Sequence, residues 1–256
     1  MMRTIARFCF VAFGAAMMLL SLHPASAAPK TTIVLVHGAF ADGSSWNKVI
    51  PMLAAGGYEV IAVQIPLTSL ADDVAATKRA IDRAEGSVVL VGHSWGGTVI
   101  TEAGMSDKVK SLVFVAAFAN DAGTSIADLA KGQPDAPGGA AIQPDKAGFL
   151  HLSAQGVADH FAPDASPDEQ KLIAVTQGPI RGANFAEKVT GAAWTTKPSW
   201  YIVAAADHMI LPALEVAMAA KIKAQTTTIS GSGHVPMLSH PKDVAEVIQA
   251  AAKAIN

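Results

Sequence analysis

Short runs of apolar residues recur along the chain and predict buried strands. The first, residues 31–36 (TTIVLV), is rich in β-branched residues and does not alternate apolar with polar positions. This pattern is typical of a strand buried on both faces of a parallel sheet. We expect further strands at residues 60–64, 88–91, 111–116 and 200–204, with a weaker one at 226–229. Helical spacing appears between them, at residues 46–55, 70–84, 98–105, 214–222 and 241–254.

The alternation of strands and helices predicts an α/β fold, a doubly wound and mostly parallel sheet with helices on both faces. In such a sheet the functional groups lie at the carboxyl ends of the strands. Residues 120–197 break the rhythm, because they are rich in Gly, Pro, Ala and Asp and show only short helical patches near residues 167–176. A connection of this length is rare in a compact domain unless it is a lid or a binding element. We therefore expect a small cap inserted between two core strands. A disordered linker between two domains is disfavoured, since the chain that follows is too short for another domain.

The N-terminus has the pattern of a secretory signal peptide. Two arginines lie within the first seven residues, residues 8–20 are nearly all apolar, and Ala25-Ser26-Ala27 is a small-x-small cleavage pattern. A membrane anchor is the alternative, but the apolar run is shorter than the roughly 20 residues that a spanning helix needs. We expect residues 1–27 to be removed after Ala27, which leaves residues 28–256 as a periplasmic or secreted domain without a membrane anchor.

Composition narrows the possible partners. The 256 residues are 51% hydrophobic and 16% charged, as in a folded globular protein. The formal net charge of −2 provides no basic surface, so nucleic acid is a poor candidate partner. Cys9, the only cysteine, lies in the predicted leader, so disulfides cannot hold the mature fold. Composition does not indicate the oligomeric state.

The stretch Gly92-His93-Ser94-Trp95-Gly96 combines a lone serine with flanking glycines. It follows a predicted buried strand and precedes a predicted helix, the context in which a G-x-S-x-G match indicates a nucleophilic serine. Such a sharp turn projects the Ser94 hydroxyl over the sheet edge and leaves no room for larger flanking side chains. The alternative is a serine that only caps the helix. A nucleophile would require two further partners.

Those partners are a histidine that accepts the serine proton and a carboxylate that orients the histidine. Asp207 follows the predicted strand SWYIVAAA, and His234 follows TTTIS in another loop between a strand and a helix. The chain order Ser94, Asp207, His234 is the order that this architecture uses. Asp121 also follows a strand and is the alternative acid.

A third requirement is a pair of N–H donors for the oxyanion. The N–H of Trp95, directly after the serine, is the first donor. The loop at residues 37–43 supplies the second, from Ala39 or, as the second choice, Phe40. We also expect the side chains of Phe40 and Trp95 to contact substrate, with a bulky indole at the site. His151, Asp159 and His160 match no familiar metal-ligand spacing and are expected to be surface residues.

These motifs together resemble the α/β-hydrolase superfamily over nearly the whole mature chain. The matching stretches are HGAFADGSSW, GHSWGG, AADHMILP around Asp207 and GSGHVPMLSHP around His234. The first and last are similar to the small cofactor-free branch that includes plant methylesterases, hydroxynitrile lyases and bacterial carboxylesterases. The resemblance implies a Ser94–His234–Asp207 triad and an oxyanion hole at Ala39 and Trp95. The chain departs from that branch at Trp95, where leucine or methionine is usual, and in the cap.

We therefore expect a serine hydrolase that cleaves a small carboxylic ester or a related acyl compound through an acyl-enzyme on Ser94. No metal or organic cofactor is implied. Two alternatives stay open. A hydroxynitrile-type lyase would use the same triad as a base and would need a lysine of the cap near the site, and a binding protein would have lost catalysis. The candidate lysines are Lys131, Lys146, Lys171 and Lys188.

Overall fold

Apolar β-branched runs form the centre of the protein as parallel strands. The computed structural model describes residues 31–255, so the predicted signal peptide at residues 1–27 lies outside the described residues and stays a prediction. Six strands form one sheet in the order β2-β1-β3-β4-β8-β9, and each neighbouring pair is parallel. The strands are Thr32–Val36 (β1), Glu59–Val63 (β2), Val88–Ser94 (β3), Val109–Ala117 (β4), Ser199–Ala204 (β8) and Gln225–Ile229 (β9). The predicted mostly parallel, doubly wound sheet is confirmed.

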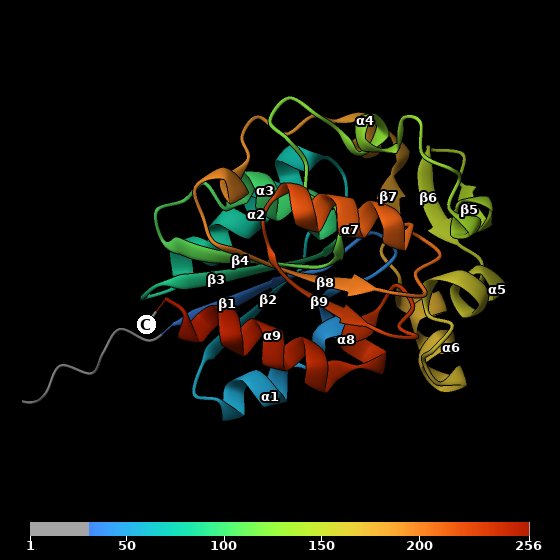
Figure 1. Cartoon of the computed structure of the whole chain (residues 1–256). Coiled ribbons are helices and arrows are strands. Elements are labelled where there is room, and N and C mark those ends of the chain that lie inside the picture. The colour runs from blue at the N-terminus through green and yellow to red at the C-terminus, as the bar shows by residue number, and fades with distance from the viewer. Residues whose placement is uncertain (1–30, 256) are drawn as a thin grey trace, which may run out of the picture.

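Helices cover both faces of this sheet. In Figure 1, α2, α3 and α7 lie above it, whereas α1, α8 and α9 lie below it. Each of these helices contributes buried residues to the hydrophobic core that it shares with the strands. Their bounds are Ile50–Ala55 (α1), Leu70–Arg83 (α2), Trp95–Ala103 (α3), Pro212–Lys221 (α7), Pro236–Ser239 (α8) and Pro241–Lys253 (α9).

The helix predicted at residues 46–55 is instead two short elements. A 3-10 turn at Gly43–Trp46 (η1) begins where the Asp42 carboxylate accepts the Ser44 N–H at 2.6 Å. Helix α1 begins later, with Pro51 in its first turn. Proline suits the first turn of a helix, because the N–H it lacks would have no intrahelical acceptor there.

The segment between β4 and β8 forms a unit of its own beyond the carboxyl ends of the parallel strands (Figure 1). It contains a three-stranded antiparallel sheet in the order β5-β6-β7. Helix α6 spans the predicted helical patch, but the strands of two to four residues were not predicted. We call residues 118–198 the insertion. Its helices and strands are Ile126–Ala130 (α4), Ile142–Pro144 (β5), Phe149–Leu152 (β6), Ala154–Gly156 (α5), Pro167–Thr176 (α6) and Ile180–Arg181 (β7). Its 3-10 turns are Pro137–Ala141 (η2), Gly182–Ala186 (η4) and Ala193–Thr195 (η5), and Val157–Phe161 (η3) is a π-helical turn.

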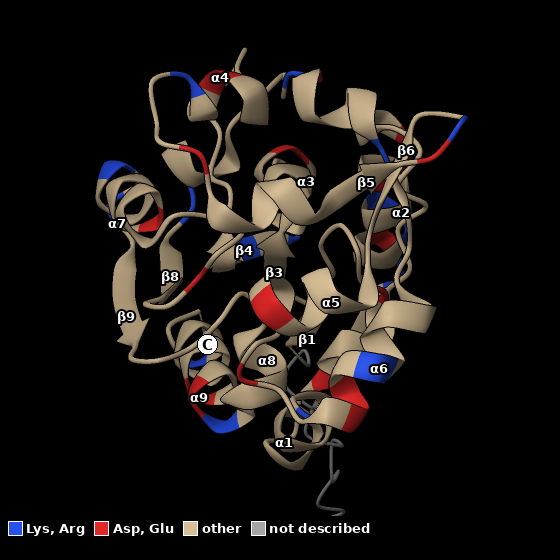
Figure 2. Ribbon diagram, turned by 90° about the vertical axis from the view of Figure 1, so that its right-hand side faces the viewer, with Lys and Arg blue, Asp and Glu red and all other residues tan. Residues whose placement is uncertain are grey.

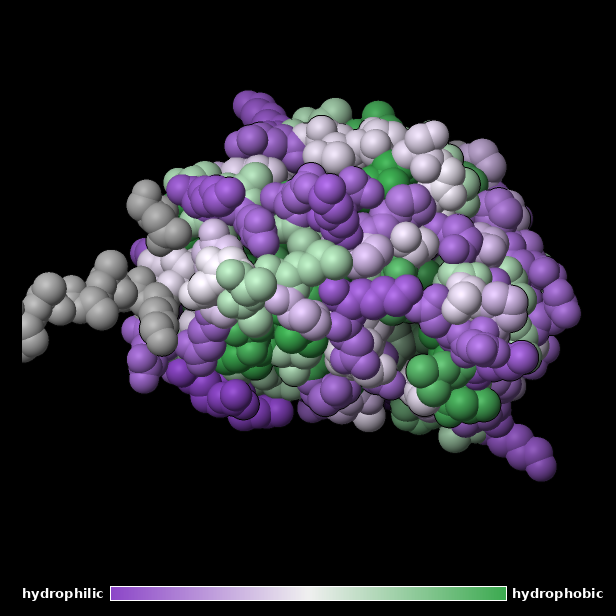
Figure 3. Space-filling model, turned by 90° about the horizontal axis from the view of Figure 1, so that it is seen from below, coloured by the Kyte–Doolittle hydropathy of each residue, from purple (hydrophilic) through white to green (hydrophobic). Residues whose placement is uncertain are grey.

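Charged residues are spread over the outside of the protein. Lysine and arginine are interspersed with aspartate and glutamate over the outer helices and loops (Figure 2). Hydrophilic and hydrophobic residues are likewise mixed on the face seen from below (Figure 3). Within residues 31–255, every helix is too short or too polar to span a bilayer.

Candidate active site

Ser94 lies at the junction of β3 and α3 in a conformation that is rare for an L-residue. Strand β3 ends at Ser94, helix α3 begins at Trp95, and the φ angle of Ser94 is 52°. A Cβ atom on Gly92 would lie 2.5 Å from the Gly96 carbonyl oxygen, and one on Gly96 would lie 2.7 Å from the His37 carbonyl oxygen. The two glycines are therefore required by backbone contacts, and the turn stores strain at a position typical of functional sites.

The side chains of Ser94, His234 and Asp207 form a continuous hydrogen-bonded chain. Ser94 Oγ lies 2.9 Å from His234 Nε2, and His234 Nδ1 lies 2.6 Å from Asp207 Oδ2. A carboxylate accepts hydrogen bonds, so the proton belongs on Nδ1 and leaves Nε2 free to accept the serine proton. All three residues are buried, and the structure brings together the nucleophile, base and acid that we predicted.

Backbone donors orient the carboxylate of Asp207. Its Oδ1 accepts the N–H groups of Met209 and Ile210 at 2.6 and 3.0 Å, which leaves Oδ2 for His234. These donors come from the loop between β8 and α7. The stretch AADHMILP thus contributes the acid and also the backbone groups that fix it.

Two buried residues behind the triad were not assigned this position from the sequence. Glu215 on α7 is fully buried, and its Oε2 accepts the Ala204 N–H at 3.1 Å. Burial, with the neighbouring Asp207, raises the pKa of Glu215 well above its usual range, which favours the neutral carboxyl group. Burial likewise lowers the pKa of His93 well below its usual range, and its neutral ring donates from Nε2 to the His234 carbonyl oxygen at 2.8 Å. The sequence signal for Glu215 is a carboxylate on the apolar face of a helix.

The loop after β1 approaches Ser94 closely. A Cβ atom on Gly38 would lie 2.7 Å from the Ser94 Cβ. His37 shapes this loop, because its Nδ1 bonds the Gly38 carbonyl at 2.8 Å and its Nε2 accepts the Ile65 N–H at 3.1 Å. Ala39 and Phe40 are thereby placed around the same cavity as Ser94, with Phe40 at a φ angle of 59°.

The first residue of a helix also has an N–H without an intrahelical acceptor. Trp95 holds that position in α3, directly after Ser94. The geometry is compatible with oxyanion donors at Ala39 and Trp95, and these roles stay predictions.

An apolar cavity of about 350 Å³ opens onto Ser94 and His234. This volume falls within the ordinary range of ligand sites, roughly 300–1,000 Å³. Its walls come from the loop after β1, from the insertion and from the loop before α7, and among the described residues no lysine or arginine lines it. The lining residues are Ala39, Phe40, Ser94, Phe118, Ile126, Ala127, Ala130, Gln133, Pro134, Asp135, Ala136, Ile142, Phe185, Met209, Ile210, Leu211, Leu214 and His234.

The structure corrects the expectation that the Trp95 indole lies at the substrate site. The indole is fully buried and is absent from the lining of the cavity. Its Nε1–H donates instead to Asp73 Oδ2 on α2 at 2.7 Å. The buried carboxylate draws the indole to the side of α3 that faces α2, because a buried indole N–H requires an acceptor. Phe40 lines the cavity, and its contact with substrate stays a prediction.

Asp121, the alternative acid, lies outside this chain of contacts. Its carboxylate pairs with Lys221 Nζ at 2.6 Å at a partly exposed position. Asp159 accepts from Gln155, and His160 contacts His208 at 3.3 Å between their Nδ1 atoms. Residues 31–255 contain no cluster of three or more histidine, cysteine, aspartate or glutamate side chains that could hold a metal ion.

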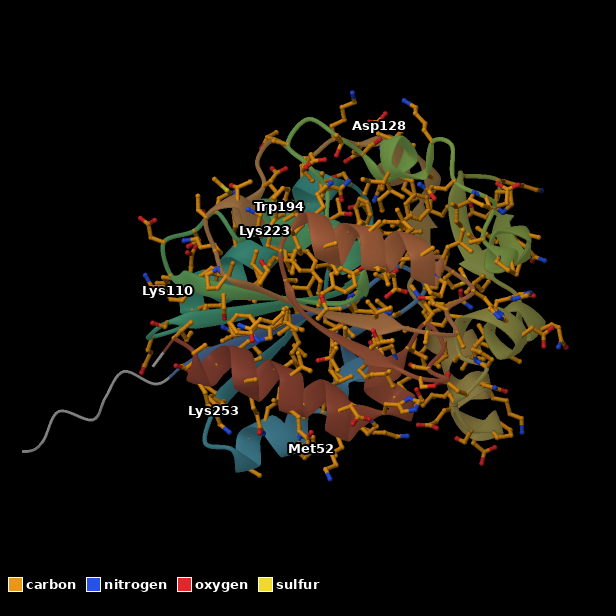
Figure 4. The ribbon with its side chains drawn as sticks, viewed as in Figure 1. Met52, Lys110, Asp128, Trp194, Lys223 and Lys253 are labelled. Carbon is orange, nitrogen blue, oxygen red and sulfur yellow. The ribbon has the colours of Figure 1, made fainter. Side chains whose placement is uncertain are left out.

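The lysines that a lyase would require are placed elsewhere in the insertion. Lys131 and Lys188 both pair with Asp128, which lies at the upper rim of the molecule on α4 (Figure 4). Lys171 pairs with Asp168 on exposed α6. Lys146 is exposed and does not line the cavity that contains Ser94.

Known proteins share this architecture. Two curated relatives are a probable hydrolase R7 from Phoma sp., 28% identical over 86% of this chain and 97% of its own, and methylesterase 8 from Arabidopsis thaliana, 26% identical over 87% of this chain and 90% of its own. The crystal structure of a pyrethroid hydrolase from Sphingobium faniae superposes with a TM-score of 0.74, covers 88% of this chain and 98% of its own, and is 23% identical. This last likeness concerns the fold alone. The model of the alpha/beta hydrolase family matches residues 33–247, and the chain therefore belongs to that family.

Proposed function

We propose that this protein is a serine hydrolase that cleaves a small carboxylic ester or a related acyl compound through an acyl-enzyme on Ser94. The observation that carries the proposal is the buried contact chain from Ser94 Oγ through His234 to Asp207, which opens onto an apolar cavity. The relatives that are named as hydrolases and methylesterases support the same reaction class.

In the proposed mechanism, Ser94 Oγ attacks the substrate carbonyl while His234 Nε2 takes the hydroxyl proton. Asp207 stabilises the imidazolium that forms, and the N–H groups of Ala39 and Trp95 donate to the oxyanion. His234 then gives the proton to the leaving alcohol as the ester bond breaks. A water molecule, deprotonated by His234, attacks the acyl-enzyme and releases the acid and free Ser94.

The lining of the cavity favours a hydrolase over a lyase. A hydroxynitrile-type lyase would need a lysine beside the triad, whereas the described residues that line the cavity include none. A binding protein without catalysis is disfavoured because the His234 ring lies within hydrogen-bonding distance of both Ser94 and Asp207. The same lining supports a neutral, mainly apolar acyl group as substrate, since burial of an unpaired charge there would be costly.

A panel of p-nitrophenyl esters tests the proposal. We expect turnover of acetate to octanoate esters by residues 28–256, and loss of at least about a thousandfold in kcat for Ser94→Ala, because triad members act as a unit. Ser106→Ala, in a loop remote from the cavity, is the matched control and should retain wild-type rates. Equal rates for Ser94→Ala and Ser106→Ala would overturn the mechanism.

A further inference from the structure

Asp73 is a buried carboxylate that the proposed mechanism does not use. It lies in the first turn of α2 with no exposed surface. Its Oδ2 accepts the Trp95 indole N–H and its Oδ1 accepts the Leu67 backbone N–H, both at 2.7 Å. One side chain therefore joins the helix that begins beside Ser94 to the loop between β2 and α2.

The ionised form of Asp73 suits its role as the acceptor of two N–H hydrogen bonds. Burial raises the pKa of the carboxyl group to about 6, the two N–H bonds oppose this rise, and the nearby charges of Asp72 and Glu187 add to it. Asp73 is therefore mostly ionised at pH 7 and above, where a carboxylate makes stronger hydrogen bonds than a neutral acceptor. Loss of either bond would leave a buried donor unpaired.

Trp95 and Leu67, the two residues that donate to Asp73, both contact the short turn η4 of the insertion at Gly182–Ala186. On one side, the Trp95 ring supports the Phe185 ring edge-on, with centroids 5.9 Å apart. On the other side, the Leu67 carbonyl accepts the amide of buried Asn184 at 3.1 Å and the Arg181 N–H at 3.0 Å. Leu67 has a φ angle of 60°, which is strained for a leucine and needs such bonds to persist.

Phe185 connects these contacts of Asp73 to the candidate active site, because the Phe185 side chain lines the same cavity as Ser94 and His234. We propose that Asp73 is a positioning residue that holds η4 from both sides and, through Phe185, sets the width of the acyl cavity. The inference rests on the proposed esterase function. In this proposal the Trp95 side chain affects substrate selection indirectly, because it packs against Phe185, which lines the cavity.

Acyl-chain selectivity tests the proposal. The readout is the ratio of kcat/KM for p-nitrophenyl octanoate to that for the butyrate, which does not depend on the fraction of folded enzyme. Asp73→Asn has one acceptor oxygen for two donors, and Trp95→Phe lacks the indole N–H. We expect each to raise the ratio roughly fivefold as the wall loosens, within the range of hydrophobic pocket discrimination. Phe185→Ala should raise it further.

The controls locate the effect. Asp72→Asn changes the adjacent, exposed carboxylate and should leave the ratio unchanged. Asp73→Asn added to Phe185→Ala should cause little further change, because both act through one wall. A ratio within twofold of wild type for Asp73→Asn, when Phe185→Ala changes it, would overturn the inference. An unchanged ratio in Phe185→Ala would overturn it as well.

Hydrogen exchange separates this inference from the proposed function. The amides of residues 182–186 should exchange faster in Asp73→Asn than in wild type or Asp72→Asn, whether or not the protein turns over esters. Absence of ester turnover would contradict the proposed function and the selectivity role that rests on it. Unchanged exchange in Asp73→Asn would contradict the anchoring itself.

Discussion

His234 is held in place by contacts from three parts of the chain. Asp207 bonds its Nδ1, His93 bonds its carbonyl oxygen, and the Phe161 ring of the insertion lies against its ring with centroids 5.3 Å apart. The next residue upstream, Gly233, donates its N–H to Asp164 of the insertion at 2.9 Å. His234 is therefore fixed by the core and the insertion together, as the proposed transfer of a proton between Ser94 and a leaving group requires.

Glu215 provides a prediction about the layer beneath the triad. Burial and Asp207 raise the pKa of Glu215 and so favour the neutral carboxyl group, whose shape and charge glutamine reproduces. We expect Glu215→Gln to keep kcat within about threefold of wild type, whereas Glu215→Ala should lower kcat and reduce stability by roughly 2–5 kcal/mol through the cavity it leaves. Steady-state kinetics and urea unfolding measure the two effects. A large loss of kcat in Glu215→Gln would mean that the ionised form is needed.

The predicted core elements match the structure because their signals are local. Each β-branched run became a strand of the sheet, and the five helical segments lie where helices formed, apart from the break between η1 and α1. The glycine-walled turn at Ser94 and the order of the triad were also readable from the residues. The insertion was not, since its strands of two to four residues have no resolvable period. The positions of Trp95 and Glu215 depend on tertiary partners, Asp73 and Asp207, that no local pattern reveals.

The turn at Ser94 predicts different costs for two glycine substitutions. Gly92→Ala would place a methyl group 2.5 Å from a backbone oxygen, and we expect a loss of about 1–3 kcal/mol in the free energy of unfolding with reduced kcat. Gly139→Ala, in η2 of the insertion, meets nothing within 4 Å and should change stability by less than about 0.5 kcal/mol. Urea unfolding compares the two variants. Equal stabilities would show that the turn tolerates a Cβ.

The sheet and the insertion both contribute residues to the candidate active site. The parallel strands bring Ser94, Asp207 and His234 to one edge of the sheet, although up to 140 positions separate them. The insertion lines the cavity with residues of α4, of the loop at residues 133–136 and of η4, and among the described lining residues Asp135 is the only aspartate, glutamate, lysine or arginine. Charged residues lie mainly over the exterior (Figure 2). No lysine or arginine lies among the described residues that line the cavity, which supports the proposed preference for neutral substrates.

This distribution of charge predicts discrimination between neutral and acidic esters. We expect a neutral p-nitrophenyl ester to be cleaved with a kcat/KM at least about tenfold above that of an ester of similar length with a terminal carboxylate, because the cavity provides no partner for that charge. The comparison should hold at pH 7 and 9, where the added carboxylate is ionised. Preference for the acidic ester would point to a cationic site that the cavity lacks.

The central claim is a covalent acyl-enzyme on Ser94, and intact-mass spectrometry of acid-quenched turnover tests it most directly. With a slowly deacylated p-nitrophenyl ester, we predict that wild-type protein gains the mass of one acyl group, that peptide mapping places this group on Ser94, and that Ser94→Ala gains none. Turnover by wild type without any adduct, together with undiminished turnover by Ser94→Ala, would contradict the account.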